Sequence, residues 1–205
     1  LLQETVVPEE YKENVVFLPS CTARKNDPIK WGTCVYVGKN ILQNGNIKNI
    51  TNEYMDNDSY SGKQVFAEIN ITPEDKVIVC SLNTNTSPDG IYSIKSHIEN
   101  IFNSKVLNKD LKNIIIGGDF NADSEMVNKY FKKTFDNIRE VFHECEPEFT
   151  QTFFGANMNK ENHYQDDHVF LSKDMSSCVE KVFTWNYGII KNYSDHTILE
   201  LEISL

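Results

Sequence analysis

Acidic and amide side chains follow directly after an apolar run in the segment KNIIIGGDFNADSE, residues 112–125. Three isoleucines and two glycines lead without a spacer into Asp119, Phe120 and Asn121. Polar groups just past a buried strand have a rigidly held backbone, and the adjoining loop leaves room for a ligand. Because side chains alternate along an extended chain, we expect Asp119 and Asn121 on one face and Phe120 on the other.

The same kind of junction occurs at three other places in the chain. They are the end of LLQE with Glu4, the start of QDDHV with Asp166 and Asp167, and YSDHTILEL with Asp195 and His196. Hard divalent cations such as Mg²⁺ prefer carboxylate oxygens and keep some of their water. Glu4 and Asp195, together with the GDFN aspartate, therefore offer ligands for such a cation if their strands converge.

The pair Asp195–His196 places a titratable imidazole beside a carboxylate. Asp167 is a candidate partner for this imidazole, because a carboxylate partner fixes the tautomer of a histidine or keeps it protonated. His168 follows Asp167 and, by strand alternation, should face the opposite way. The competing interpretation is that each strand-end carboxylate is a solvated cap, which is the commoner situation for any one of them alone.

Two other metal sites are disfavoured by the residues themselves. DFNAD resembles the start of a Ca²⁺ loop, but Ser124 stands where that loop needs Gly and Tyr130 where it needs Glu. FHECE lacks the partner residues of a zinc site, so His143 and Cys145 are interpreted as structural.

The elements that would position these residues are mostly strands. Alternating or continuous apolar runs predict strands, and the helical spacing of Ile91, Ile94 and Ile98 predicts an amphipathic helix. We expect strands at 15–19, 31–38, 64–71, 76–84, 113–118, 149–154, 166–172, 178–185 and 197–205, helices at 90–107 and 123–135, and a polar loop at 20–30. The segment IREVFHECE fits either state. Many strands with few helices indicate sheets packed together, an α/β or α+β layered fold.

The 205 residues carry a formal net charge of −10, which disfavours long-range attraction of a polyanion unless a bound cation reverses the local field. The five cysteines are odd in number and widely spaced, which favours free thiols in a reducing compartment and predicts a cytoplasmic protein. No apolar run is long enough for a membrane span. The chain begins LLQETV without an initiator Met, so its start carries no information about a signal peptide.

Taken in order, LLQET, WGTCVYV, IIIGGDFNA, DDHVFLS and YSDHTILEL resemble the motifs of the endonuclease/exonuclease/phosphatase superfamily, the DNase I-like and exonuclease III-like proteins. The resemblance covers nearly the whole chain. It implies a four-layer α/β sandwich, with two facing mixed β-sheets between outer helices. It also implies cleavage of phosphate esters, most often nucleic-acid phosphodiesters, with Mg²⁺ or Mn²⁺ as cofactor. Residues 1–205 would form a single domain that lacks the first strand and helix of the family pattern.

The motifs assign a metal side and a water side to the implied site. Glu4 matches the family's metal-binding glutamate, and Asp195 of SDH matches a second carboxylate on the metal side. Asp119 of GDFN matches the aspartate that orients or deprotonates the attacking water. Asn121 matches the asparagine that helps to hold the nucleophile and the phosphate.

The motifs also assign the phosphate side, where the sequence departs from the family pattern. His196 matches the histidine placed against the scissile phosphate, and Asp167 matches its aspartate partner. Ser81 stands where many relatives carry His or Tyr, and a serine provides neither a ring against the phosphate nor a general acid. Asn83 or Asn85 would then contact the phosphate instead, and Ser81 and Asn83 are our candidates for substrate binding.

Three functions are compatible with these features. The first is a nuclease that hydrolyses DNA or RNA by metal-assisted in-line attack of water. The second is a phosphatase, or a phosphodiesterase for lipids or small molecules, which the acidic charge favours because duplex binding normally recruits Lys and Arg. The third is a catalytically degenerate binding or regulatory module, which Ser81 and the missing first strand favour.

Overall fold

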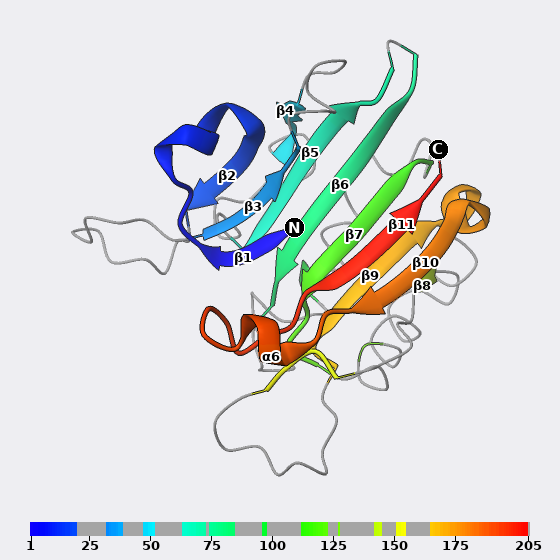
Figure 1. Ribbon diagram of the computed structural model, residues 1–205. Helices are drawn as coiled ribbons and strands as arrows, with labels where there is room; N and C mark the ends of the chain where they lie inside the picture. Colours follow the sequence, from blue (N-terminus) through cyan, green and yellow to red (C-terminus); the bar gives the residue numbers. More distant parts are fainter. Residues whose placement is uncertain are drawn as a thin grey trace.

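A six-stranded mixed sheet forms the centre of the protein in the computed structural model (Figure 1). The structure describes residues 1–19, 32–38, 47–51, 63–72, 74–84, 96–97, 112–122, 127, 142–144, 151–154 and 165–204. In spatial order the strands are β4 (Ile47–Asn49), β5 (Gln64–Asn70), β6 (Lys76–Asn83), β7 (Ile114–Asp119), β9 (Asp167–Ser172) and β8 (Phe142–Glu144). Only β6 and β7 pair in parallel; the other neighbours are antiparallel.

Two smaller antiparallel sheets lie over the same face of the central sheet (Figure 1). One has the order β1 (Leu2–Thr5), β3 (Gly32–Tyr36), β2 (Val15–Pro19), and the other pairs β10 (Val179–Thr184) with β11 (Leu199–Ile203). The register of β1 against β3 shifts between Leu2 and Thr5, the stretch that contains Glu4. Such irregularities often re-aim side chains beside functional sites.

The apolar core fills the space between the central sheet and the two smaller sheets. Alternate residues of β5, β6, β7 and β9 point into it, as period-2 alternation requires. The core joins side chains of all three sheets, among them Val16, Val35, Val65, Val79 and Leu171, with Val182 and Leu201 packed against it. Burial of this shared surface holds the sheets face to face, because transfer of apolar area out of water is the dominant favourable term in folding.

The described helices are short. They are η1 (Glu9–Asn14) and η3 (Lys173–Cys178), both 3₁₀, and α6 (Tyr187–Ile190), which begins after Asn186. The Asn186 side chain accepts a hydrogen bond from the backbone N–H of Gly188, as an N-cap residue does. The helices predicted at 90–107 and 123–135 fall almost entirely outside the described residues, as does the loop predicted at 20–30.

Eight of the nine strands predicted from apolar patterning are confirmed, and so is the mixed fold with facing sheets. β2, β3, β5, β6, β7, β9, β10 and β11 lie within one or two residues of the predicted bounds. The ambiguous segment IREVFHECE contributes β8, and 149–154 supplies an isolated bridge between Phe153 and His196. Cys34, Cys80 and Cys178 are free thiols, and none of the helices in the described ranges has the length and apolar character to cross a membrane.

Candidate active site

Three polar residues form one row across adjacent strands at an edge of the central sheet. Asn83, the last residue of β6, pairs in register with Asp119, the last residue of β7, and Asp119 pairs with Asp167, the first residue of β9. Register partners point to the same face of a sheet. These three side chains therefore share the face that carries the core, at the point where the apolar residues end.

Asp119 and Asn121 are held together by the turn that follows β7. The backbone N–H of Asn121 donates to Asp119 Oδ1 at 2.8 Å, and its Nδ2 donates to Asp119 Oδ2 at 2.9 Å and to the carbonyl of Thr84 at 2.8 Å. Asn121 has φ 48°, a left-handed conformation that asparagine tolerates better than most residues. Phe120 is fully buried. The predicted division of these side chains between two faces is confirmed.

Gly118 is required by the backbone just before Asp119. Its φ is +141°, and an added Cβ would lie 2.1 Å from the carbonyl oxygen of Leu82. Only glycine fits this conformation and this close approach of β7 to β6. The second glycine of GGDFN therefore allows the backbone conformation at the end of β7, where Asp119 lies.

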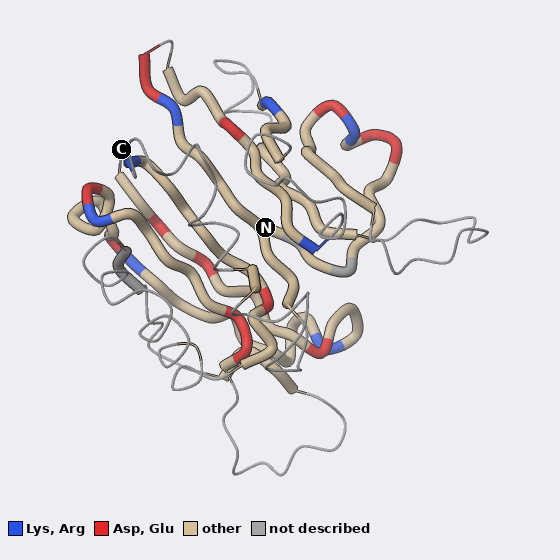
Figure 2. The backbone as a smooth tube through the Cα atoms, turned by 180° about the vertical axis from the view of Figure 1, so that it is seen from behind, with Lys and Arg blue, Asp and Glu red and all other residues tan. Residues whose placement is uncertain are grey.

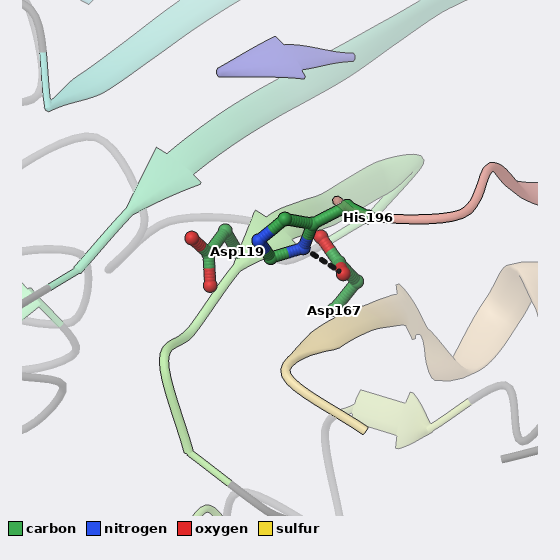
Figure 3. A group of neighbouring side chains, drawn as sticks. All are labelled: Asp119, Asp167 and His196. Carbon is green, nitrogen blue, oxygen red and sulfur yellow. Dashed lines mark hydrogen bonds and ion pairs between the residues drawn. The ribbon is translucent and has the colours of Figure 1, made fainter. Parts of the chain in front are cut away.

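His196 and Asp167 form the predicted imidazole–carboxylate pair. His196 Nδ1 lies 2.8 Å from Asp167 Oδ2, although 29 positions separate the two residues in the chain. Figure 3 shows the imidazole between the carboxyl groups of Asp167 and Asp119, with the hydrogen bond to Asp167 dashed. His168 points to the opposite face, where it is fully buried and its Nε2 lies 2.9 Å from the carbonyl of Ala122.

The segment 151–154 holds this pair in place. The hydroxyl of Thr152, fully buried, accepts hydrogen bonds from the backbone N–H groups of Asp166 and Asp167 at 2.9 and 3.0 Å. The Thr152 carbonyl accepts from the N–H of Thr197 at 2.7 Å, and the next residue forms the bridge to His196. One short segment thus connects the start of β9 to the stretch that carries the imidazole.

Burial and the neighbouring charges alter the pKa values of the site. Burial and the negative charge of Asp167 raise the pKa of Asp119 to about 7, against the opposing effects of His196 and the Asn121 N–H. Burial lowers the pKa of His196, but its hydrogen bond to Asp167 and the charges of Asp167, Asp119 and Asp195 outweigh burial and raise the pKa to about 9. At neutral pH the imidazole is therefore protonated.

Asp119, Asp167 and His196 also form a possible cation-binding group. One ligand atom from each lies within 4.8 Å of the others. Figure 2 shows acidic positions from separate strands gathered at this end of the sheets. Carboxylate oxygens are the preferred ligands of hard divalent cations. Burial and, second to it, the charge of Asp167 raise the pKa of Asp119, and a bound cation would oppose both effects. The two carboxylates thus fit a divalent cation, whereas the protonated His196 lies beside them as a hydrogen-bond donor.

Of the two residues expected on the metal side, Asp195 is located by its contacts and Glu4 by its strand alone. Glu4 lies in β1, and the structure describes its backbone but not its side chain. Asp195 is exposed, its carbonyl accepts the N–H of Phe154 at 2.7 Å, and its charge acts on the neighbouring His196. Asp195 therefore lies beside the cluster, and Glu4 is located only by its strand.

The two residues expected to bind substrate are both buried. Ser81 is fully buried between the sheets, and its hydroxyl accepts a hydrogen bond from Gln3 Nε2 at 2.8 Å. This contact ties β1 to β6, so Ser81 has a place in joining the sheets rather than at an open surface. Asn83 is 2% exposed, and its Oδ1 accepts a hydrogen bond from Lys63 Nζ at 2.7 Å.

Lys63, Thr152 and Gln3 contribute to the surroundings of the site, but the sequence carries no signal that marks them. Lys63 precedes a strand in SGKQVF and has the appearance of an ordinary loop lysine. Thr152 lies within FTQTFF, where a threonine is typical of a strand. Gln3 stands beside Glu4, but no pattern distinguishes it. Their contacts depend on pairing between distant segments, which spacing in one sequence does not encode.

Comparison with known proteins gives a match in structure only. Neither the protein-family models nor the curated proteins yield a match to this sequence. Among solved structures, the endonuclease domain of TRAS1, a telomere-specific non-LTR retrotransposon, is similar with a TM-score of 0.61 and 14% identity, covering 92% of this chain and 79% of that one. An endonuclease/exonuclease/phosphatase from Bacteroides vulgatus has a TM-score of 0.58 at 14% identity, covering 93% of this chain and 76% of that one.

An AP endonuclease from Archaeoglobus fulgidus is also similar, with a TM-score of 0.56 and 12% identity over 74% of this chain and 69% of that one. Identities this low establish the fold and not the activity. The chain has the fold of the endonuclease/exonuclease/phosphatase superfamily, as the ordered motifs predicted.

Proposed function

We propose that the protein is a metal-dependent phosphodiesterase that hydrolyses nucleic-acid phosphodiester bonds by in-line attack of water. The observation that carries the proposal is the convergence of Asp119, Asp167 and His196, whose ligand atoms lie within 4.8 Å of one another although the residues come from distant parts of the chain. The similarity in fold to endonucleases supports the same class of chemistry by analogy.

Asp119 is the residue proposed to orient and deprotonate the attacking water. A carboxyl group with a pKa of about 7 is well matched to general-base catalysis near neutral pH. The two hydrogen bonds from Asn121 hold both of its oxygens in place. Asn121 thereby limits the freedom of the base, and orientation of this kind is a large part of enzymatic rate enhancement.

His196 is the residue proposed to face the scissile phosphate. Its Nδ1 is engaged by Asp167 at 2.8 Å, which leaves Nε2–H of the imidazolium to donate to a non-bridging phosphate oxygen. A fixed cationic donor stabilises the negative charge that develops on these oxygens in the transition state. Asp167 keeps the ring oriented and protonated, as its effect on the pKa of His196 indicates.

Glu4 and Asp195 are proposed to hold Mg²⁺ or Mn²⁺ beside this cluster. When bound, the cation would supply charge stabilisation as a Lewis acid for the phosphate oxygens. Glutamate and aspartate are the ligand types that such a cation prefers. Glu4→Gln should therefore weaken binding of Mn²⁺ in titration calorimetry while leaving the unfolding temperature of the metal-free protein nearly unchanged.

The proposal is tested by assaying DNA, RNA and bis(p-nitrophenyl) phosphate with Mg²⁺ or Mn²⁺. Asp119→Ala and His196→Ala should each abolish turnover while the circular dichroism spectrum stays that of the folded protein. Asp75→Asn is a matched control, because Asp75 is an exposed turn residue bonded to Thr72. Wild-type rates in both site variants would refute these roles.

A small phosphate ester is the second candidate substrate, and the net charge of −10 favours it. Binding of nucleic acid releases counterions and falls steeply with salt, whereas binding of a small ester depends on salt weakly. The dependence of KM on NaCl concentration therefore separates the two substrates. If KM depends only weakly on NaCl concentration and only small esters are cleaved, the substrate is a small phosphate ester and not a nucleic acid.

A further inference from the structure

Lys63 is a nearly buried lysine beside the candidate active site. It is 6% exposed and lies directly before β5, opposite the last residue of β6. Its carbonyl accepts the backbone N–H of Asn83 at 2.8 Å, and its Nζ lies 2.7 Å from Asn83 Oδ1. Burial of an ammonium group costs free energy unless hydrogen bonds compensate for the lost water. A lysine at this position therefore calls for a specific role.

The contact with Lys63 decides how the amide of Asn83 is oriented. An ammonium group has three donors and no acceptor, so the amide atom that faces it must be the oxygen. The amide N–H₂ group of Asn83 is then directed away from Lys63. Asn83 is the register partner of Asp119, so it stands between Lys63 and the proposed general base in the row across the sheet.

We propose that Lys63 is a positioning residue that fixes the Asn83 amide so that its N–H₂ group donates to a non-bridging oxygen of the substrate phosphate. The inference rests on the proposed function, and it identifies a hydrogen-bond donor to the substrate phosphate in the same site. The charges that act on the pKa of Asp119 are those of Asp167, His196 and Asp166. Lys63 is therefore assigned an effect through Asn83, not a direct effect on the base.

A double-mutant cycle with bis(p-nitrophenyl) phosphate and Mg²⁺ tests this assignment. Lys63→Met and Asn83→Ala should each lower kcat/KM by about 10-fold or more, because a misplaced donor no longer stabilises the transition state. The double variant should be no slower than Asn83→Ala alone. Effects that multiply would show that Lys63 acts independently of Asn83 and would overturn the inference.

Two further variants separate positioning from folding. Lys63→Arg keeps a cationic donor and should restore part of the rate, whereas Lys63→Gln should not. Lys76→Met is the matched control, because Lys76 is an exposed lysine paired with Glu68, and its rate should equal that of the wild type. If Lys63→Met fails to fold, the contrast between Arg and Gln decides: equal rates for these two variants would contradict the inference.

A readout that does not require turnover keeps the inference separate from the proposed function. In ¹H–¹⁵N spectra with Mg²⁺ present, inorganic phosphate should shift the two side-chain amide protons of Asn83, and Lys63→Gln should reduce this shift. If the wild type cleaves none of the esters, the proposed function fails, yet the amide signals still report on the inference. Asn83 signals that do not respond to phosphate would refute it.

Discussion

Asp119 and Asp167 are direct register partners on β7 and β9, so two carboxyl groups stand side by side at the end of the sheet. Like charges directly opposite each other destabilise an antiparallel pair. The cost appears in the pKa of Asp119, which burial and the charge of Asp167 raise to about 7. This pair of carboxyl groups thus lowers the stability of the fold while no cation offsets their charge.

The first prediction is that the stability of metal-free Asp119→Asn, relative to that of the wild type, rises between low and high pH. The folded-state pKa of Asp119, about 7, lies above its ordinary value of 3.8, so the folded state binds the proton more tightly than the unfolded state. Stability from this group is therefore complete below pH 3.8 and is lost as pH rises through 7. Removing the charge should recover on the order of 1–3 kcal/mol at pH 8.

Urea unfolding in EDTA at pH 8 and at pH 3.5 measures this difference between the wild type and Asp119→Asn. The gain should be present at pH 8 and vanish at pH 3.5. Asp75→Asn, at an exposed turn, should show no such gain. A stability of Asp119→Asn relative to the wild type that does not rise between pH 3.5 and pH 8 would contradict the electrostatic account of the site.

The second prediction concerns the pKa of His196. Burial lowers this pKa, and Asp167 is the largest of the influences that raise it to about 9. In Asp167→Asn the effect of burial remains while the main opposing influence is lost, so the pKa should fall by about 2 units or more. Asp195→Asn removes the weakest of the raising charges and should lower the pKa much less. An NMR titration of the His196 ring protons measures all three values, and equal shifts in the two variants would oppose this ranking.

The third prediction is that Thr152→Val damages the site without removing any group proposed to touch substrate. The hydroxyl accepts two backbone N–H groups, from Asp166 and Asp167, and a methyl group accepts neither. Buried donors left unsatisfied cost about 1–3 kcal/mol each, so the unfolding temperature should fall. Turnover of bis(p-nitrophenyl) phosphate should fall with it, because the start of β9 is no longer fixed. Thr152→Ser keeps the acceptor and should restore both the unfolding temperature and the turnover. If it restores neither, the hydroxyl does not hold the start of β9 in place.

The sequence alone predicts the strands well, and the reason is physical. The strands β5, β6, β7 and β9 are buried on at least one face, so their apolar residues form alternating or continuous runs that the sequence displays. The contact between Asp119 and Asn121 is also accessible from the sequence, because the two residues are only two positions apart, although it is formed by a turn with a left-handed Asn121 and not by strand alternation. The pairing of Asp167 with His196 follows from residue chemistry once the motifs have been placed together.

Contacts between distant segments are less accessible to sequence reasoning. Lys63 meets Asn83 only because β5 and β6 pair in this register, and a shift by one residue would place their side chains on opposite faces. Thr152 acts through its position between β9 and the stretch that carries His196, and no spacing marks it. Ser81 accepts a hydrogen bond from Gln3 in another sheet, a contact that no spacing in the sequence reveals.

The fourth prediction isolates the role of Gly118 in carrying Asp119. In Gly118→Ala the new Cβ would lie 2.1 Å from the carbonyl oxygen of Leu82, at a φ of +141° that side chains rarely adopt. Since that oxygen belongs to the backbone of the paired strand, relief requires β6 and β7 to separate. We expect a loss of about 3 kcal/mol or more in the free energy of unfolding. Gly38→Ala is the matched control, because nothing lies within 4 Å of the added Cβ, and it should change stability by no more than about 0.5 kcal/mol. Urea titrations monitored by tryptophan fluorescence provide both values, and equal stabilities of the two variants would mean that β7 does not need glycine to reach Asp119.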